Sequence, residues 1–148
     1  FRQIKYGESG IIARIYTRLF GLQSYFVHGV RKKKSKIKAN LFQPLTLLDM
    51  EVLKRENKEL HRIIQIRVIP DCSGIQQDLG KTSIALFLAD LQYKCIREEE
   101  TNLEMFDFLW STVIDLAKNK ESIANYHLSF MISFFSRPCN VFFPLVNI

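Results

Sequence analysis

The chain of 148 residues is long enough for one ordinary domain, or for two small ones that share an interface. Hydrophobic residues make up 47% of it and charged residues 24%, a balance typical of soluble globular proteins, and no apolar run approaches the length of a membrane span. The three cysteines are widely spaced and form no Cys-x-x-Cys pair, which argues against a disulfide framework and a zinc site. We therefore expect reduced thiols, a cytoplasmic location and no metal or other cofactor.

The net charge of +6 is divided unevenly along the chain. Residues 1–70 carry 15 Lys and Arg against 5 Asp and Glu, a net charge of +10, whereas residues 71–148 have a net charge of −4. Such an asymmetry predicts two modules, with an anionic ligand bound by the first. We expect a first module over residues 1–70, a joint over 71–80 and a second module over 81–148.

The first module has the pattern of short β-strands. The chain opens at Phe1 without an initiator Met or a signal peptide, so we expect that earlier residues are missing and that residues 1–6 belong to one strand. Residues 11–17 alternate between apolar and polar and form a hairpin with residues 22–28, placing Arg14 and Tyr16 on one face. A third strand is expected from Pro44, and a fourth over residues 60–69 with Ile64 and its alternate neighbours on one face. Five short strands linked mostly by hairpins predict a small, curved barrel.

A basic segment separates the second and third of these strands. Six of the ten residues from Gly29 to Lys38 are cationic and none is acidic. So dense a cluster repels itself unless an anion lies near, and a phosphate backbone is the natural anion. The alternative interpretations are a solubilising surface and a localisation signal, but the run lies inside a folded module. We predict a loop that binds nucleic acid.

After Pro70 the apolar residues recur at helical spacing. We expect one helix ending near Arg97, a second opened by a Thr101-x-x-Glu104 capping box with Leu103 on its apolar stripe, and a third capped by Ser122. Three helices joined by short loops predict a small bundle packed against the barrel. The fold class is thus α+β, strands first and helices second, with no helix expected before Pro70.

No catalytic arrangement emerges from the remaining motifs. Residues 74–82 partly match a phosphate-binding loop, but five residues instead of four separate Gly74 from Gly80, and the context is not that of an NTPase. The three histidines are scattered, and none has a Cys or carboxylate at metal-ligand spacing. The acidic run at residues 98–100 is most simply a solvated turn, although it could meet a basic partner. We do not expect an enzyme.

Cations mixed with aromatic residues on a sheet face are what single-strand binding requires, because the charges follow the phosphates and the rings stack on bases. No base-reading element is apparent, so we expect binding without sequence preference. The candidate DNA-binding residues are Arg14, Tyr16, Tyr25, Arg31, Lys32, Lys33, Lys34, Lys36, Lys38, Arg62 and Arg67.

Four stretches resemble the amino-terminal part of the bacterial recombination mediator family RecO. They are Tyr-Gly-Glu-Ser at residues 6–9, Tyr-Thr-Arg-Leu-Phe-Gly at 16–21, Gly-Val-Arg-Lys at 29–32 with Ser-Lys at 35–36, and Leu-Phe-Gln-Pro at 41–44. Residues 81–135 are more loosely similar to the family's helical domain. The resemblance implies a five-stranded OB-fold barrel followed by a small helical bundle.

The resemblance also implies a role and partners. A member of this family binds single- and double-stranded DNA, promotes strand annealing, works with RecR, contacts the carboxy-terminal tail of single-strand-binding protein and helps to load RecA. It is not an enzyme and not a membrane protein. Some relatives carry a four-cysteine zinc site, which nothing here supplies. Where the family usually has a Leu-Gly-aromatic-x-Pro turn, residues 136–144 differ, so we expect a truncated or altered helical domain and an exposed apolar tail at residues 141–146 that favours poor solubility or a dimer.

Two other hypotheses remain open on the residues alone. An RNA-binding OB-fold module would bind RNA in preference to DNA. A protein-interaction scaffold, whose basic segment is only a solvated surface, would bind neither nucleic acid at physiological salt.

Overall fold

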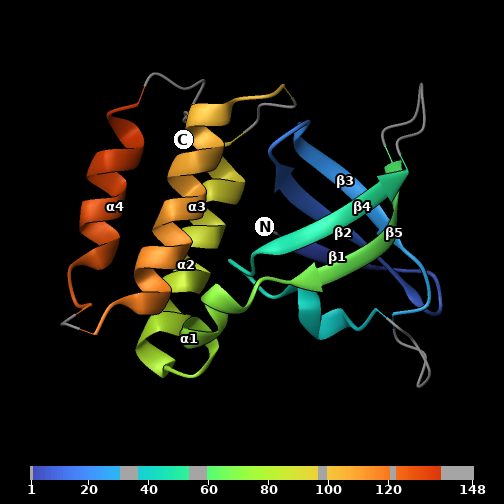
Figure 1. Cartoon of the computed structure of the whole chain (residues 1–148), viewed down its shortest axis with the longest axis horizontal. Coiled ribbons are helices and arrows are strands. Elements are labelled where there is room, and N and C mark those ends of the chain that lie inside the picture. Colours follow the sequence, from blue (N-terminus) through green and yellow to red (C-terminus); the bar gives the residue numbers. More distant parts are fainter. Residues whose placement is uncertain (1, 31–36, 54–59, 97–99, 121–122, 138–148) are drawn as a thin grey trace, which may run out of the picture.

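The structure is a computed structural model that describes residues 2–30, 37–53, 60–96, 100–120 and 123–137. A sheet lies on one side and the helices on the other (Figure 1). The strands are β1 (Arg2–Tyr6), β2 (Gly10–Thr17), β3 (Gly21–Val27), β4 (Leu48–Leu53) and β5 (Leu60–Val68). The helices are α1 (Ser73–Gln76), α2 (Leu79–Cys95), α3 (Leu103–Lys118) and α4 (Tyr126–Phe135).

The sheet has the strand order β1-β2-β3-β5-β4. The pairs are antiparallel except for β3 with β5, which run parallel. Among the described residues β1 and β4 are the two edges and do not pair, so the sheet is open where we expected a closed barrel. The α+β class with five strands before the helices is confirmed.

The turn between β2 and β3 is set by Thr17 and Gly21. The Thr17 hydroxyl donates to the Gly21 carbonyl oxygen at 3.1 Å and accepts from the Phe20 N–H at 3.2 Å. Gly21 has a φ of 62°, a left-handed conformation that strains residues with a Cβ. The turn fixes the register of the hairpin, in which Tyr16 lies opposite Leu22 and Ile12 opposite Phe26.

The hydrophobic core lies on both faces of this hairpin. On the inner face Ile11, Ala13, Tyr25 and Val27 pack with Ile63 of β5. On the outer face one end of the hairpin contributes to a cluster within the bundle; its buried members are Tyr16, Leu22, Leu88, Cys95, Ile96, Met105, Leu109, Phe130 and Phe134. The bundle therefore packs against one end of the outer face of the hairpin.

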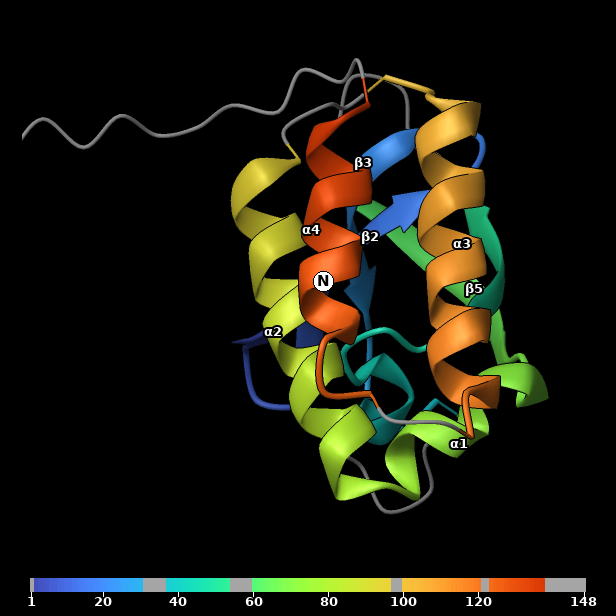
Figure 2. The same cartoon turned by 90° about the vertical axis from the view of Figure 1, so that its left-hand side faces the viewer.

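The helices form two layers beside the sheet. Helices α2 and α3 lie next to it, and α4 packs outside them (Figures 1 and 2). The Tyr126 hydroxyl at the start of α4 donates to the Thr112 carbonyl oxygen of α3 at 2.8 Å. Burial, followed by the negative charge of Asp115, raises the pKa of Tyr126 to about 12. No helix in the described part of the chain is long and apolar enough to cross a membrane.

The third strand does not begin at Pro44 as predicted. Residues Gln43 to Thr46 form a turn in which the Thr46 N–H donates to the Gln43 carbonyl oxygen at 3.2 Å, and β4 begins only at Leu48. Leu45 has a φ of 55°, a conformation that leucine rarely adopts. Its side chain packs against two core clusters, and this packing holds the strained turn. A short 3-10 helix (Ala39–Phe42) also precedes it, where no helix was expected.

A β-bulge makes the predicted faces of the fourth strand wrong at Ile63 and Ile64, whereas the part of the strand beyond the bulge faces the core as predicted. Glu51 pairs with Gln65 and Val52 with Ile63, so Ile64 is left without a partner on β4. As a result Ile63 is buried in the inner cluster, whereas Ile64 is 54% exposed.

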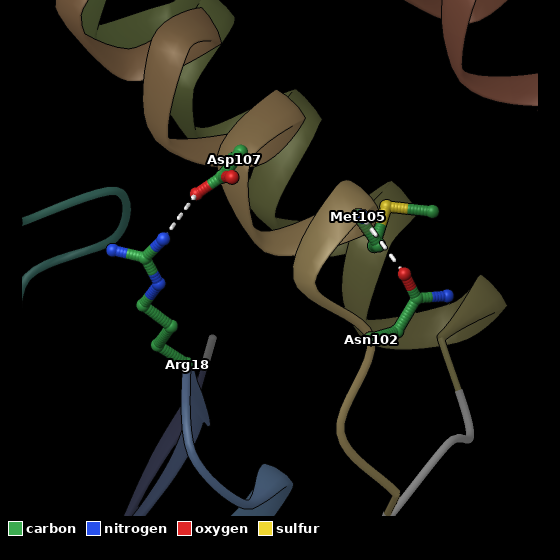
Figure 3. Close-up of polar contacts among 4 residues, drawn as sticks. All are labelled: Arg18, Asn102, Met105 and Asp107. Carbon is green, nitrogen blue, oxygen red and sulfur yellow. Dashed lines mark hydrogen bonds and ion pairs between the residues drawn. The ribbon is translucent and has the colours of Figure 1, made fainter.

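The second bundle helix begins one residue later than the capping box predicts. The side chain of Asn102 caps α3 by accepting a hydrogen bond from the Met105 N–H at 2.9 Å (Figure 3). Thr101 instead donates its hydroxyl to the Leu19 carbonyl oxygen at 2.8 Å. Leu103, which the pattern predicted on the apolar stripe, is exposed.

The other helices agree with the pattern in part. Phe130 and Phe134, which recur at helical spacing in α4, are buried, whereas Phe87 of α2 is exposed and lies beside the His127 ring, 5.8 Å between centroids. The predicted cap Ser122 and the apolar tail at residues 141–146 lie outside the described residues.

Candidate nucleic-acid interface

The centre of the basic segment lies outside the described residues, and with it Arg31, Lys32, Lys33, Lys34 and Lys36. The described residues on either side, Val30 and Ile37, both pack in the inner cluster. The basic segment is therefore flanked on both sides by residues that pack in the inner cluster. Lys38 is described and exposed there.

Arg14 and Tyr16 project from the outer face of β2 toward the bundle. The Arg14 guanidinium carbon is 5.9 Å from the centroid of the Tyr93 ring of α2, and its side chain is half-buried. Tyr16 is only 8% exposed and stacks with Phe106 of α3 at 6.5 Å between centroids. The prediction that Tyr16 offers an exposed ring is wrong, because the bundle covers this end of the face.

Tyr25 is also buried, for a different reason. It lies on the inner face opposite Ala13, is fully buried, and has its ring centroid 6.0 Å from that of His61. Burial raises the pKa of its phenol. A ring in this position cannot stack on a base, so the prediction for Tyr25 is wrong as well.

The two arginines of β5 differ in their pairing. Arg62 is exposed, and no ion pair is recorded for it among the described residues. Arg67 is exposed too, but its Nε donates to the Asp49 carboxylate at 2.7 Å. A phosphate at Arg67 would have to displace that carboxylate, so Arg62 is the better placed of the two.

Sequence reasoning missed an aromatic patch, which we define as Tyr6, Phe26 and His28. The Tyr6 and Phe26 rings meet edge to face at 5.6 Å, and the Phe26 and His28 rings lie 6.0 Å apart. Tyr6 is 54% exposed and His28 is exposed as well. Gly10 leaves room for this arrangement, because a Cβ there would lie 2.7 Å from the Phe26 ring.

The patch continues across the sheet to Arg62. Ile4 lies opposite Ile12, Ile12 opposite Phe26, and Phe26 opposite Arg62, so one row of side chains on the outer face crosses four strands. Beside it a hollow of about 340 Å³ is lined by Phe26, His28, Leu60, His61 and Arg62. The row thus combines exposed rings, apolar surface and a cation next to the exits of the basic segment.

Hairpin register is the signal that would have found this patch. Gly7, with a φ of 60°, turns the chain so that Tyr6 pairs with Gly10. The tight turn at Gly21 then places Phe26 on the same face of the hairpin as Ile12. Following the register of the two turns from β3 through to β1 brings Tyr6 and Phe26 onto one face.

The other end of the outer face is fixed to the bundle by polar contacts as well as by packing. Arg18, in the turn after β2, lies 3.7 Å from the Asp107 carboxylate of α3 (Figure 3). Both side chains are largely exposed, so this pair orients the turn more than it stabilises the fold. Among the described residues there is no group of three or more His, Cys, Asp or Glu that could hold a metal ion.

The sequence of this chain is similar to those of known proteins. A family model described as Recombination protein O N terminal matches residues 1–70. The DNA repair protein RecO of Bacteroides fragilis is 39% identical over 129 residues, which are 87% of this chain and 53% of that protein. Residues 1–70 thus match the amino-terminal part of the RecO family, and the chain is similar to RecO proteins over most of its length. Its open sheet, with strand order β1-β2-β3-β5-β4, is the OB-fold part expected of a RecO amino terminus.

Two further RecO proteins are similar to about the same share of this chain. That of Flavobacterium psychrophilum is 35% identical over 130 residues, and that of Phocaeicola vulgatus is 34% identical over 131 residues. The chain spans about half the length of these curated relatives.

Proposed function

We propose that this chain is the DNA-binding part of a DNA repair and recombination protein that acts without catalysis. Its relatives carry the name DNA repair protein, and its positive charge is concentrated in residues 1–70. The observation that carries the proposal is the row from Ile4 to Arg62 with the aromatic patch, open on the outer face. We take residues 1–70 as the DNA-binding domain, 71–80 as the joint and 81–148 as the helical domain.

The row of side chains from Ile4 to Arg62 suits single-stranded DNA, because its bases are free to unstack from one another. Rings such as Tyr6 and Phe26 bind any base through its π-face, so contact does not depend on sequence. Arg62, Lys38 and the basic segment supply charge for the phosphates on either side. A duplex keeps its bases stacked inside, so it can use the charges but not the rings.

Neutralised phosphates would also favour annealing. Two strands held against one cationic surface repel each other less, which lowers the barrier to their pairing. We extend the proposal to the partners that the family resemblance implies, namely RecR, the tail of single-strand-binding protein and, through them, RecA.

Salt-dependent binding to a fluorescent oligo(dT) strand tests the charge part of the proposal. If the surface contacts about five phosphates, the slope of log affinity against log salt is about −3.5 on a single strand. Changing Lys32, Lys33 and Lys34 to Ala together should flatten that slope by about 2 and weaken binding.

A matched triple variant controls for net charge. Lys94, Lys118 and Lys120 are exposed cations of the helical part, and changing all three to Ala removes the same charge. That variant should keep the slope. Equal slopes in the two triple variants would contradict the role of the basic segment. Tighter binding to a matched RNA strand would favour the RNA-binding alternative, and no binding to either would favour the scaffold.

A further inference from the structure

The hollow beside the aromatic patch is large enough to hold a planar ring. Its volume is about 340 Å³, and its lining residues are Phe26, His28, Leu60, His61 and Arg62. Sites that bind small organic molecules in proteins commonly measure about 300–1,000 Å³. The hollow lies where β3 and β5 run parallel, beside the stretch of β3 from Ser24 to Phe26. A nucleobase of a bound strand could therefore enter it.

Four of the lining side chains gather on the outer face of the sheet. Phe26 is the register partner of Arg62, and paired residues on neighbouring strands share a face. Leu60, two residues before Arg62, lies on that same face. The His28 ring is 6.0 Å from the Phe26 ring, between centroids. The hollow is thus part of the proposed binding surface, at the end of the row that begins at Ile4.

The lining offers one flat apolar wall and one fork of hydrogen-bond donors. The Phe26 ring is half-buried and meets the Tyr6 ring edge to face at 5.6 Å. Arg62 is exposed, and no ion pair is recorded for it among the described residues. Within the described part of the chain no carboxylate lines the hollow to compete for that guanidinium. A matching ligand is flat and presents two neighbouring acceptors.

Of the four DNA bases, guanine fits this lining best. Its O6 and N7 are adjacent acceptors on one edge, and they match two parallel N–H groups of an arginine. Adenine has an amino group beside its N7, so one arginine N–H would face a donor. Cytosine and thymine have a single ring, which covers less of an aromatic side chain than a purine does.

We propose that the hollow is a base-binding subsite that prefers guanine, an inference that rests on the DNA binding proposed above. The Phe26 ring stacks on the base, and the Arg62 guanidinium donates to its O6 and N7. When thymine occupies this position, Arg62 contacts a phosphate instead. The other rings of the row accept any base, so the preference is confined to one position of the strand.

Three short strands of about ten nucleotides test this preference. The first is oligo(dT), the second carries one guanine at its centre, and the third carries 7-deazaguanine there. We expect the guanine strand to bind about tenfold more tightly than oligo(dT) in fluorescence anisotropy, the discrimination that one bidentate pair supplies. The 7-deazaguanine strand keeps the double ring but lacks the N7 acceptor, so it should lose most of this gain.

Arg62→Lys is the matched variant, because lysine keeps the positive charge but not the fork. It should bind oligo(dT) with an unchanged salt slope and lose the tenfold preference for guanine. Equal affinities of the unaltered chain for oligo(dT) and the guanine strand, with the salt slope intact, would overturn the subsite and leave the proposed function standing. A full preference that survives in Arg62→Lys, or with 7-deazaguanine, would also overturn the subsite. Binding of none of the three strands would overturn both proposals.

Discussion

The outer face of the β2–β3 hairpin has two ends that are built alike and differ in what covers them. At one end Tyr16 and Leu22 lie opposite each other and are buried under α2 and α3. At the other end Ile12 and Phe26 lie opposite each other, and the neighbouring Tyr6 is exposed. An aromatic residue on the same strand face is core in one place and part of the proposed binding surface in the other, and the position of the bundle makes the difference.

We expect the two ends of the outer face to have separate roles. The covered end should carry stability, because its side chains are removed from water by the helices. The open end should carry DNA binding, because its rings and Arg62 remain available. Variants at the two ends should therefore affect different measurements.

Leu22→Ala tests the covered end. Leu22 is 1% exposed, and removal of its side chain leaves a cavity in the cluster shared by sheet and bundle. We expect the free energy of unfolding to fall by about 2–5 kcal/mol in urea titration. The fraction that remains folded should bind oligo(dT) with unchanged affinity. A loss of affinity in this folded fraction would contradict the separate roles of the two ends.

Gly10→Ala tests the geometry of the open end without removing a ring. The new Cβ would lie 2.7 Å from the Phe26 ring, which would have to move. Because base stacking is worth about 1–3 kcal/mol per base, partial loss should weaken oligo(dT) binding by about tenfold in fluorescence anisotropy. Unchanged affinity would mean that Phe26 does not stack on a base.

Arg62→Ala and Arg67→Ala separate a free cation from a paired one. Arg62→Ala should reduce the salt slope by about 0.7, the share of one phosphate contact on a single strand. Arg67→Ala should change the slope less, because Arg67 already binds the Asp49 carboxylate. The same anisotropy titrations at several salt concentrations measure both, and a larger effect at Arg67 would reverse the assignment.

Tyr126→Phe probes the bundle that covers the closed end. In the folded chain the pKa of Tyr126 is about 12, above its ordinary value of 10.0. The unfolded chain therefore loses this proton first, so stability is full below about pH 10 and falls as the pH rises toward 12. The variant loses the hydrogen bond to Thr112 but should show a shallower decline of Tm between pH 10 and 12. An equally steep decline of Tm in the variant would mean that the titration of other groups causes it.

Local patterns in the sequence predicted the elements better than they predicted the faces. Alternation located β2, β3 and β5, and helical spacing located the three longer helices. The bulge at Ile64 shifts the strand pattern by one residue and so changes which side chains are buried, and the cap of α3 is Asn102 where Thr101 is predicted. Neither difference follows from composition, because each depends on a partner elsewhere in the fold.

The candidate site shows the same limit more sharply. Charge alone pointed to Arg62 and to the basic segment, and both remain candidates. The sequence pattern predicts Tyr16 and Tyr25 as aromatic residues on strands. It does not predict their burial, because Tyr16 is covered by the bundle and Tyr25 lies in the inner core. Tyr6 and Phe26 come together only through the register of three strands, so recognising them required the turns to be followed across the sheet.

The affinity of Tyr6→Ala for oligo(dT), measured beside that of Phe87→Ala, tests whether DNA binds at the open end of the sheet. Tyr6 and Phe87 are both exposed aromatic residues, one in the aromatic patch and the other on α2. We predict that Tyr6→Ala weakens binding by about tenfold, the effect of one lost stacking contact, and that Phe87→Ala leaves it unchanged. Equal affinities for the two variants would contradict the assignment of DNA binding to the open end of the sheet.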